Sequence, residues 1–403
     1  MKKYVCAMLC VFFIFLSAGC GGGSGYTGAT TTAVTGTAPP GTSPVPSEEM
    51  RAVWLTHNEI YSMCKTGNGF RENISSAISA VADAGINTLI VQMRPFSDAL
   101  YHSGIFPSSS YLGEAQGSDY DFDALEIIIK EAKSRGVSVH AWINPYRVSY
   151  STDFSALADS NPAKLWHSRA EDASRLIVCE KGIWYKPSSP EVQRLIIDGA
   201  CEIVRNYDID AIHLDDYFYP VTDESIDAAE YGEYLSLGGI LSLAQWRREQ
   251  VSCMVSGLYA AIKRIKSGVL LGISPSGKIA CNIDEMYADV GRWCSEDGYV
   301  DYIAPQLYYG FLNGTCPFEK TALEWQELVK NPDVSLIFGL AAYKCGKADE
   351  YAGTDEAKNE WINDSGVLLR QIEYIRTLEK HSGFALFSYS GIWNTNIADF
   401  SLK

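Results

Sequence analysis

Two adjacent carboxylates follow an apolar run near the middle of the chain. Residues 209–220 read IDAIHLDDYFYP, so Asp215 and Asp216 stand directly after a segment typical of a buried strand and directly before three aromatic residues. Carboxyl groups transfer protons as general acids or bases, and a neighbouring negative charge raises the pKa of an acid towards the range in which it can donate a proton. Two neighbours on one strand end point in different directions. We therefore interpret the pair as two acids with two different tasks.

Other interpretations of these residues compete with acid chemistry. The aspartates could form a structural network with Arg94 or Arg147. A metal site is disfavoured, because the chain has only six histidines and contains neither an H-x-H nor an H-x-x-x-H pair. Ser274 lies outside any G-x-S-x-G sequence, which argues against a serine hydrolase. We expect neither a metal nor another cofactor.

The elements that position the pair follow a repeated alternation. Amphipathic helical patterns, such as those of residues 125–135 and 192–207, separate most of a series of short apolar runs. The runs are residues 51–56, 87–93, 137–143, 209–214, 269–274, 300–307, 335–341 and 383–389. Eight such units predict an α/β fold, a (β/α)8 TIM barrel, because parallel strands need helical crossovers and are buried on both faces. An open doubly wound sheet is the competing fold. In that fold a glycine-rich loop usually follows the first strand, and no such loop follows the first apolar run here.

A barrel places its chemistry at the C-terminal ends of its strands. At these positions the sequence combines hydrogen-bonding groups with flat aromatic rings, which suits the hydroxyl groups and C–H faces of sugars. The predicted catalytic residues are Asp215 and Asp216. The predicted substrate-binding residues are Arg94, Asp98, Asn144, Tyr146, Arg147, Tyr217, Tyr219, Ser274, Gln306, Tyr308, Tyr343 and Trp393. The alternative for each tyrosine is that it only caps the barrel core.

The same strand ends carry a resemblance to a known family. The segments are MRAVWLT, NTLIVQMRPFSDALY, GVSVHAWINPYRV, IDAIHLDDYFYP, GISPSG, DYIAPQLYYGF and LAAYK. In this order they resemble the signature segments of the glycosyl hydrolase-like 10 family of bacterial exported proteins, over roughly residues 49–390. The resemblance implies a barrel glycosidase, with some members acting on peptidoglycan glycan strands stripped of their peptides.

The mechanism depends on where a second carboxylate would come from. Standard glycosidases place two carboxyl groups on opposite sides of the scissile bond, but strands six to eight end here without an acid in their first positions. If the substrate carries a 2-acetamido group, its own carbonyl oxygen can attack the anomeric carbon. We then expect Asp215 to polarise the acetamido group and Asp216 to protonate the leaving oxygen. The reverse assignment stays open, as does a surface lipoprotein that binds glycans without cleaving them.

The N-terminus predicts export. Lys2 and Lys3 precede a short apolar stretch that ends at Cys20, so residues 1–20 resemble a lipoprotein signal with Cys20 as the lipid attachment site. Leu16 lies four residues before the cysteine rather than the usual three, which leaves simple secretion as the alternative. Residues 21–48 are rich in Gly, Ser, Thr and Pro and predict a flexible linker, and residues 49–403 form the hydrolase-like domain.

The charge of the chain restricts its partners. The formal net charge of −16 disfavours nucleic acid and anionic lipid head groups. We expect a monomer that binds a carbohydrate polymer or oligosaccharide and touches a membrane only through its lipid anchor. The predicted location is the cell envelope.

Overall fold

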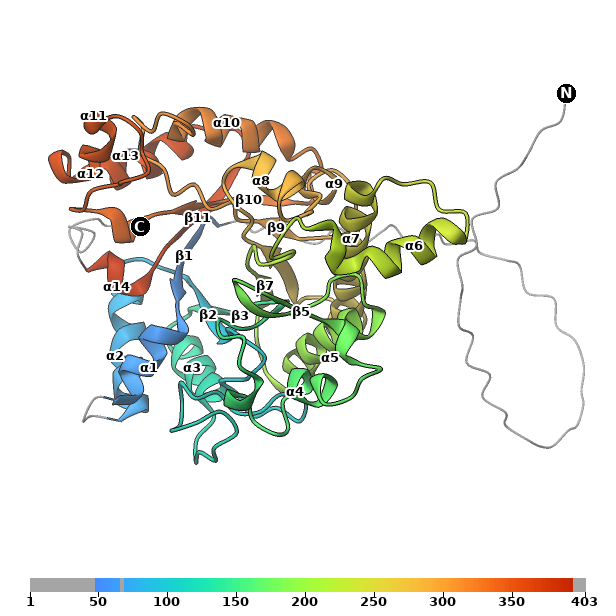
Figure 1. The fold of residues 1–403 in the computed structure, drawn as a ribbon. Coiled ribbons are helices and arrows are strands. Elements are labelled where there is room, and N and C mark those ends of the chain that lie inside the picture. The colour runs from blue at the N-terminus through green and yellow to red at the C-terminus, as the bar shows by residue number, and fades with distance from the viewer. Residues whose placement is uncertain (1–47, 66–68, 394–403) are drawn as a thin grey trace, which may run out of the picture. The chain divides into compact units, whose positions relative to one another are not determined.

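The computed structural model describes residues 48–65 and 69–393, which form a closed barrel of eight parallel strands (Figure 1). The strands are hydrogen-bonded in the order β1-β11-β10-β9-β8-β7-β3-β2. They are β1 (Met50–Leu55), β2 (Thr88–Arg94), β3 (Ser138–Ile143), β7 (Ala211–Leu214), β8 (Leu270–Ile273), β9 (Tyr302–Ile303), β10 (Ser335–Leu340) and β11 (His381–Leu386). The predicted (β/α)8 fold is confirmed. The predicted signal, Cys20 and the linker up to residue 47 lie outside the described residues.

Helices surround the strands (Figure 1). They are α1 (His57–Lys65), α2 (Phe70–Asp83), α3 (Ala124–Lys133), α4 (Pro162–His167), α5 (Pro190–Asn206), α6 (Ala228–Ser236), α7 (Leu243–Ile265), α8 (Ile279–Asp284), α9 (Val290–Trp293), α10 (Phe318–Leu328), α11 (Asp355–Lys358), α12 (Glu360–Asn363), α13 (Val367–Ile375) and α14 (Tyr389–Ile392). Short 3-10 helices span Phe154–Ala156, Ala173–Arg175, Glu224–Asp227 and Ala342–Lys344. Within the described residues, no helix is long and apolar enough to cross a membrane.

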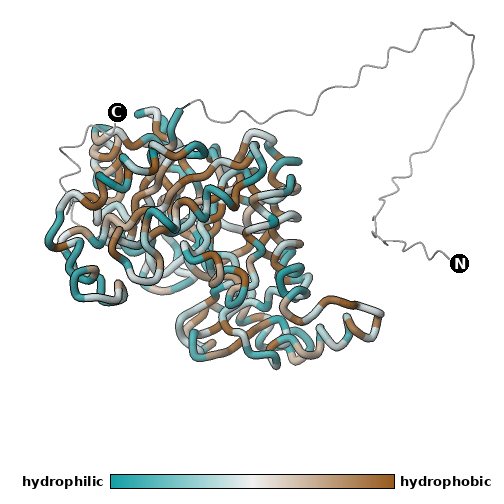
Figure 2. Tube along the Cα trace, turned by 90° about the horizontal axis from the view of Figure 1, so that it is seen from above, coloured by the Kyte–Doolittle hydropathy of each residue, from teal (hydrophilic) through white to brown (hydrophobic). Residues whose placement is uncertain are grey.

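The side chains of each strand alternate between the barrel interior and the helices. In β1, Ala52 and Trp54 belong to the interior cluster, whereas Val53 and Leu55 pack against the helices. Figure 2 shows hydrophobic residues concentrated in the body of the barrel, while the loop between α6 and α7 projects from it with an apolar tip. Leu237 and Ile240 in this loop are 81 % and 92 % exposed.

A column of polar side chains crosses the barrel interior. The Tyr302 hydroxyl lies 2.8 Å from Nδ1 of His140 and 2.8 Å from Nδ1 of His213. Trp54 Nε1 donates to His213 Nε2 at 3.3 Å, and Ser274 Oγ lies 3.0 Å from the same nitrogen. Burial lowers the pKa of both histidines, which keeps them neutral. His213 is therefore a satisfied core histidine.

The sixth barrel strand is shorter than its apolar pattern. Residues 300–307 predicted a full strand, but β9 contains only two residues. Pro305 follows closely and has no amide hydrogen to donate to a neighbouring strand, so the ladder is interrupted there. Isolated bridges from Gln306 to Ser276 and Gly339 continue the sheet beyond the proline.

A second, smaller sheet extends the connection between β3 and α5. It is antiparallel, has the order β4-β6-β5, and consists of β4 (Arg147–Ser149), β5 (Leu176–Cys179) and β6 (Gly182–Tyr185). Gly182 has φ 103°, and a Cβ atom there would lie 2.0 Å from the carbonyl oxygen of Ser149. Only glycine allows this close approach between the β5–β6 hairpin and β4.

Candidate active site

The C-terminal ends of the barrel strands surround a small cavity of about 200 Å³. We refer to it as the small cavity. It is lined by Trp54, Thr56, His57, Asn58, Gln92, Trp142, Arg147, Tyr150, Asp215, Asp216, Tyr217, Ser274, Gln306, Tyr308 and Phe387. Both aspartates of the predicted pair lie in its wall, together with aromatic rings and amide groups.

Asp215 is the more deeply buried acid of the pair. It is 2 % exposed and accepts a hydrogen bond from Trp142 Nε1 at 3.0 Å. Its other oxygen, Oδ1, is buried and makes no hydrogen bond of normal geometry with the described residues. Burial raises the pKa of Asp215 to about 7; Arg147 opposes this shift, and the charge of Asp216 adds to it. The backbone amide of Tyr217 also acts on this carboxylate and lowers its pKa, and Oδ1 can accept a hydrogen bond from a ligand.

Asp216 lies between the small cavity and a second one of about 640 Å³, the large cavity. Asp216, Tyr217 and Gln306 line both cavities, so Asp216 is the one acid of the described residues that faces both. Burial raises its pKa to about 6, while a hydrogen bond from Gln306 and the charge of Arg147 act in the opposite direction. For both acids, burial is the largest cause of the raised pKa. The sequence had suggested the negative charge of the neighbouring aspartate as the cause.

Arg147 supplies positive charge beside the pair. Its guanidinium carbon lies 4.1 Å from the centre of the Tyr217 ring and 4.5 Å from that of Tyr150, so the cation is held between aromatic faces. Asn144 fixes the backbone at this point, because its Oδ1 accepts hydrogen bonds from the amides of Tyr146 at 3.2 Å and Arg147 at 2.9 Å. Arg147 therefore faces the acids from a rigid turn at the end of β3.

The β5–β6 hairpin forms one wall of the large cavity. The cavity is lined by Glu180, Lys181, Trp184, Asp216, Tyr217, Tyr219, Pro220, Val221, Thr222, Glu285, Met286 and Gln306. Lys181 Nζ donates to the carbonyl oxygen of Pro220 at 2.7 Å, which ties the hairpin to the loop after β7. Trp184 Nε1 donates to the carbonyl oxygen of Lys181 at 3.1 Å, and its ring centre lies 6.0 Å from that of Tyr217.

Glu59 is an acid near the site that is already fully engaged. Its Oε2 accepts from the amide of Thr56 at 2.7 Å, and its Oε1 accepts from Ser388 Oγ at 2.7 Å and from the amide of Ser390 at 2.7 Å. It joins the ends of β1 and β11 and lines neither cavity. Among the described residues, the small cavity thus has no carboxylate besides the pair, and no cluster of acids, histidines and cysteines could hold a metal ion.

The structure brings half of the predicted substrate-binding residues to the two cavities. Those that line the small cavity are Arg147, Tyr217, Ser274, Gln306 and Tyr308. Tyr219 lines the large cavity alone. Those that line neither are Arg94, Asp98, Asn144, Tyr146, Tyr343 and Trp393.

The residues outside the cavities support the site from behind or lie beside it. The register of β2 shifts between Gln92 and Arg94, so Gln92 lines the cavity while Arg94 is buried with its guanidinium carbon 4.6 Å from the Phe106 ring centre. The Tyr343 ring packs edge-on against Tyr308, with ring centres 5.9 Å apart.

Asp98 and Trp393 also lie away from the cavities. Asp98 is buried, accepts a hydrogen bond from Gln116 Nε2 at 3.0 Å, and has its pKa raised to about 6 by burial. Trp393 is 41 % exposed and has its ring centre 5.8 Å from that of Tyr389.

Several lining residues were not among the predicted site residues. Trp54 and Trp142 come from inside β1 and β3, two positions before Thr56 and Asn144. The period-2 alternation of a strand could have found them, because side chains two positions apart lie on the same face. The β5–β6 hairpin was also missed, although Glu180-Lys181-Gly182 between two apolar runs is a hairpin signal.

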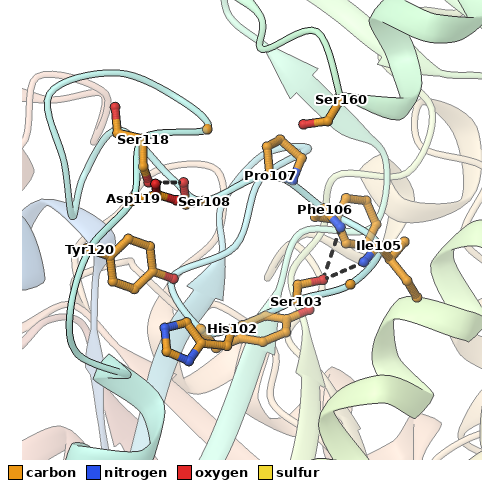
Figure 3. A pocket seen from close by; sticks show the side chains of 13 residues that line it. His102, Ser103, Ile105, Phe106, Pro107, Ser108, Ser118, Asp119, Tyr120 and Ser160 are labelled. Atoms are coloured by element: carbon orange, nitrogen blue, oxygen red, sulfur yellow. Dashed lines mark hydrogen bonds between the residues drawn. The ribbon is translucent and has the colours of Figure 1, made fainter.

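A third cavity, of about 550 Å³, lies elsewhere on the loop between β2 and α3 (Figure 3). The rings of His102 and Tyr120 lie on one side of it, with centres 5.4 Å apart, and Pro107 and Phe106 lie on other sides (Figure 3). It shares no lining residue with the small or the large cavity. It is therefore separate from the strand-end site.

A closed parallel barrel with buried acids and aromatic rings at its strand ends belongs to the class of TIM barrels that carry a candidate site at the C-terminal ends of their strands. Within this class, the chain belongs to the glycosyl hydrolase-like 10 family, whose model matches residues 49–355. This confirms the resemblance seen in the sequence.

Curated relatives agree with this assignment, and a solved structure shares the fold. Glycosyl hydrolase YngK of Bacillus subtilis is 34% identical over 84% of this chain and 68% of its own length. Glycosyl hydrolase DigH of Escherichia coli is 30% identical over 87% of this chain and 85% of its own. The PgaB (BpsB) glycoside hydrolase domain of Bordetella bronchiseptica shares the fold, with a TM-score of 0.60 and 14% identity over 88% of this chain and 100% of that domain.

Proposed function

We propose that the protein hydrolyses glycosidic bonds in a glycan that contains N-acetylhexosamine, such as peptide-free peptidoglycan strands. The observation that carries this proposal is the position of Asp216 in the wall shared by two cavities. A glycosidic oxygen under cleavage lies between the sugar that is attacked and the leaving group. An acid that faces both spaces is suited to protonate that oxygen.

The two acids have different surroundings, and this supports different tasks. Asp215 lines only the small cavity and keeps Oδ1 without a partner, so it can accept the N–H of a 2-acetamido group there. Holding that N–H increases the negative charge on the acetamido oxygen, which then attacks the anomeric carbon. As the bond to the leaving group breaks, Asp216 gives its proton to the departing oxygen. Water then attacks the anomeric carbon and opens the cyclic intermediate, and Asp216 accepts a proton from that water.

Single protonation of the pair matches this mechanism. Burial raises the pKa values of Asp215 and Asp216 to about 7 and about 6, so between these values the pair holds one proton, mainly on Asp215 in the free protein. A substrate N–H that bonds to Asp215 favours the ionised form of this acid, and the proton then passes to Asp216. Below this window both carboxyl groups are protonated and Asp215 loses the charge that polarises the substrate. Above it the acid has no proton to give. We expect kcat/KM to peak between about pH 6 and pH 7.

The proposal includes the location of the protein. The signal-like residues 1–20 and the Gly, Ser, Thr and Pro-rich residues 21–48 support a lipoprotein of the cell envelope, anchored through Cys20. Cys20→Ala should move the full-length protein out of the membrane fraction. Detergent-dependent membrane association of that variant would count against the anchor.

The catalytic test compares substrates with poor and good leaving groups. Asp216→Asn should lose ~10²–10⁴-fold in kcat on glycan strands and much less on nitrophenyl N-acetylglycosaminides, whose leaving groups need little protonation. Asp215→Asn should lose activity on both substrates, because both need the acetamido attack.

Two further experiments distinguish substrate-assisted hydrolysis from a two-carboxylate mechanism and from binding alone. A thiazoline analogue of the cyclic intermediate should inhibit far more tightly than the substrate binds. Asp98→Asn should retain activity, since this acid lies outside both cavities. A covalent sugar ester trapped on any aspartate by a fluoroglycoside would contradict the substrate-assisted mechanism. Glycan binding without any hydrolysis would instead support a carbohydrate-binding lipoprotein.

A further inference from the structure

The proposed mechanism does not yet say which part of the substrate lies in the large cavity. Its volume of about 640 Å³ is about three times the 200 Å³ of the small cavity. Asp215 lines only the small cavity, so the sugar under attack lies there. Since Asp216 protonates the oxygen that joins this sugar to the leaving group, the leaving group lies on the other side of Asp216, in the large cavity.

We propose that the large cavity binds at least two sugar units of the leaving group, so that the protein cleaves bonds followed by two or more units of the glycan chain. This inference rests on the proposed function. A cavity about three times the size of the one that holds the attacked sugar is larger than a single further unit needs.

The walls of the large cavity have the chemistry for sugar units. Tyr217 lines both cavities and is 37 % exposed; Arg147 packs against its ring and the buried Trp184 stands beside it, so the remaining exposed surface of Tyr217 is available to C–H faces. Glu180, Lys181 and Glu285 add charged groups that can bind hydroxyl and acetamido groups. Their mixture of signs and the aromatic surface suit a polyhydroxylated ligand.

The walls are also fixed before any ligand binds. The hydrogen bond from Lys181 to Pro220 holds the hairpin against the loop after β7. The same loop is held from the other side by Arg247, which donates to the carbonyl oxygens of Thr222 at 3.1 Å and Asp223 at 2.7 Å. Because little of the wall must be ordered on binding, contacts made there can contribute to affinity and to catalysis.

Filling the large cavity tests the proposal. Thr222→Trp places a bulky ring at a lining position without removing a side chain that holds the wall. In the full-length protein we expect the ratio of kcat/KM on glycan strands to kcat/KM on nitrophenyl N-acetylglycosaminides to fall at least ~10-fold, equivalent to ~1.4 kcal/mol of lost transition-state binding. Ser160→Trp is the matched control, since Ser160 lines only the separate cavity of Figure 3, and its ratio should stay unchanged.

Product analysis gives the second readout. Digestion of defined N-acetylhexosamine oligosaccharides by the unmodified protein should release fragments of two or more units from the reducing end. Release of single reducing-end sugars, or an unchanged substrate ratio in Thr222→Trp, would overturn this inference while leaving the hydrolase assignment intact. Failure of the unmodified protein to hydrolyse either substrate would overturn the proposed function itself.

Discussion

The burial of Asp215 makes the stability of the fold depend on pH. Asp215 is 2 % exposed, and its pKa is raised from 3.8 to about 7. A carboxyl group whose folded-state pKa exceeds its unfolded-state pKa binds its proton more tightly in the folded protein. The fold therefore loses stability as the pH rises through the interval between the two values, and the loss is complete above the folded-state pKa. Asp215→Asn removes the charge that burial disfavours.

The size of the effect follows from the shift. The difference between 3.8 and about 7 is about 3 pKa units, or ~4 kcal/mol at ~1.4 kcal/mol per unit. With an unfolding entropy of ~2 cal/mol/K per residue, a domain of this length gains ~5 °C in Tm from that amount. The asparagine can still accept the hydrogen bond from Trp142, so little of the gain should be lost.

Calorimetry at two pH values measures this difference. At pH 4 the Tm of Asp215→Asn should match that of the unmodified protein, because the carboxyl group is then neutral in the folded state. At pH 8.5 the variant should be the more stable by several degrees, although it is catalytically impaired. Asp223→Asn, at an exposed loop acid, is the control and should show no such pH-dependent gain. An equal Tm difference at both pH values would refute the argument from burial.

Three more substitutions test other parts of the structure. Arg147→Gln removes a charge that holds down the pKa of both acids of the pair, so the kcat/KM optimum should move to higher pH by roughly half a unit to one unit. Arg247→Met breaks a fully buried ion pair with Asp227 and should cost ~3–5 kcal/mol in urea unfolding, with a smaller loss when Asp227→Leu is added. Gly272→Ala would bring a Cβ atom to 1.9 Å from the Tyr302 ring, so its Tm should fall by several degrees; an unchanged Tm would contradict the packing of the interior.

The barrel could be predicted because its strands are buried on both faces. The run 137–143 corresponds to β3 at Ser138–Ile143, and the run 335–341 corresponds to β10 at Ser335–Leu340. Continuous apolar runs of this length are typical of parallel strands. The run 300–307 overestimated β9, because hydrophobicity alone does not register the missing amide hydrogen of Pro305.

The place of the two aspartates in the cavity wall could be predicted, because residues directly after a strand lie at the C-terminal end of a barrel. Arg94 also follows this rule in the sequence, but a register shift after Gln92 turns it away from the cavity. Such a shift depends on pairing with β3, which local sequence does not specify. The large cavity could not be predicted either, because it requires Lys181 to meet Pro220 from a distant part of the chain.

The hairpin of β5 and β6 forms a wall of the large cavity, but it does not carry the two acids. Its strands pair with each other and with β4, whereas the acids belong to the end of the barrel strand β7. Variation of residues 176–185 in length or composition can therefore change the shape of the large cavity, while Asp216 stays at the end of the barrel strand β7. Under the proposed function, exchanging this hairpin between β4 and α5 is a route to altered specificity when the contacts of Lys181 with Pro220 and of Trp184 with Tyr217 are kept.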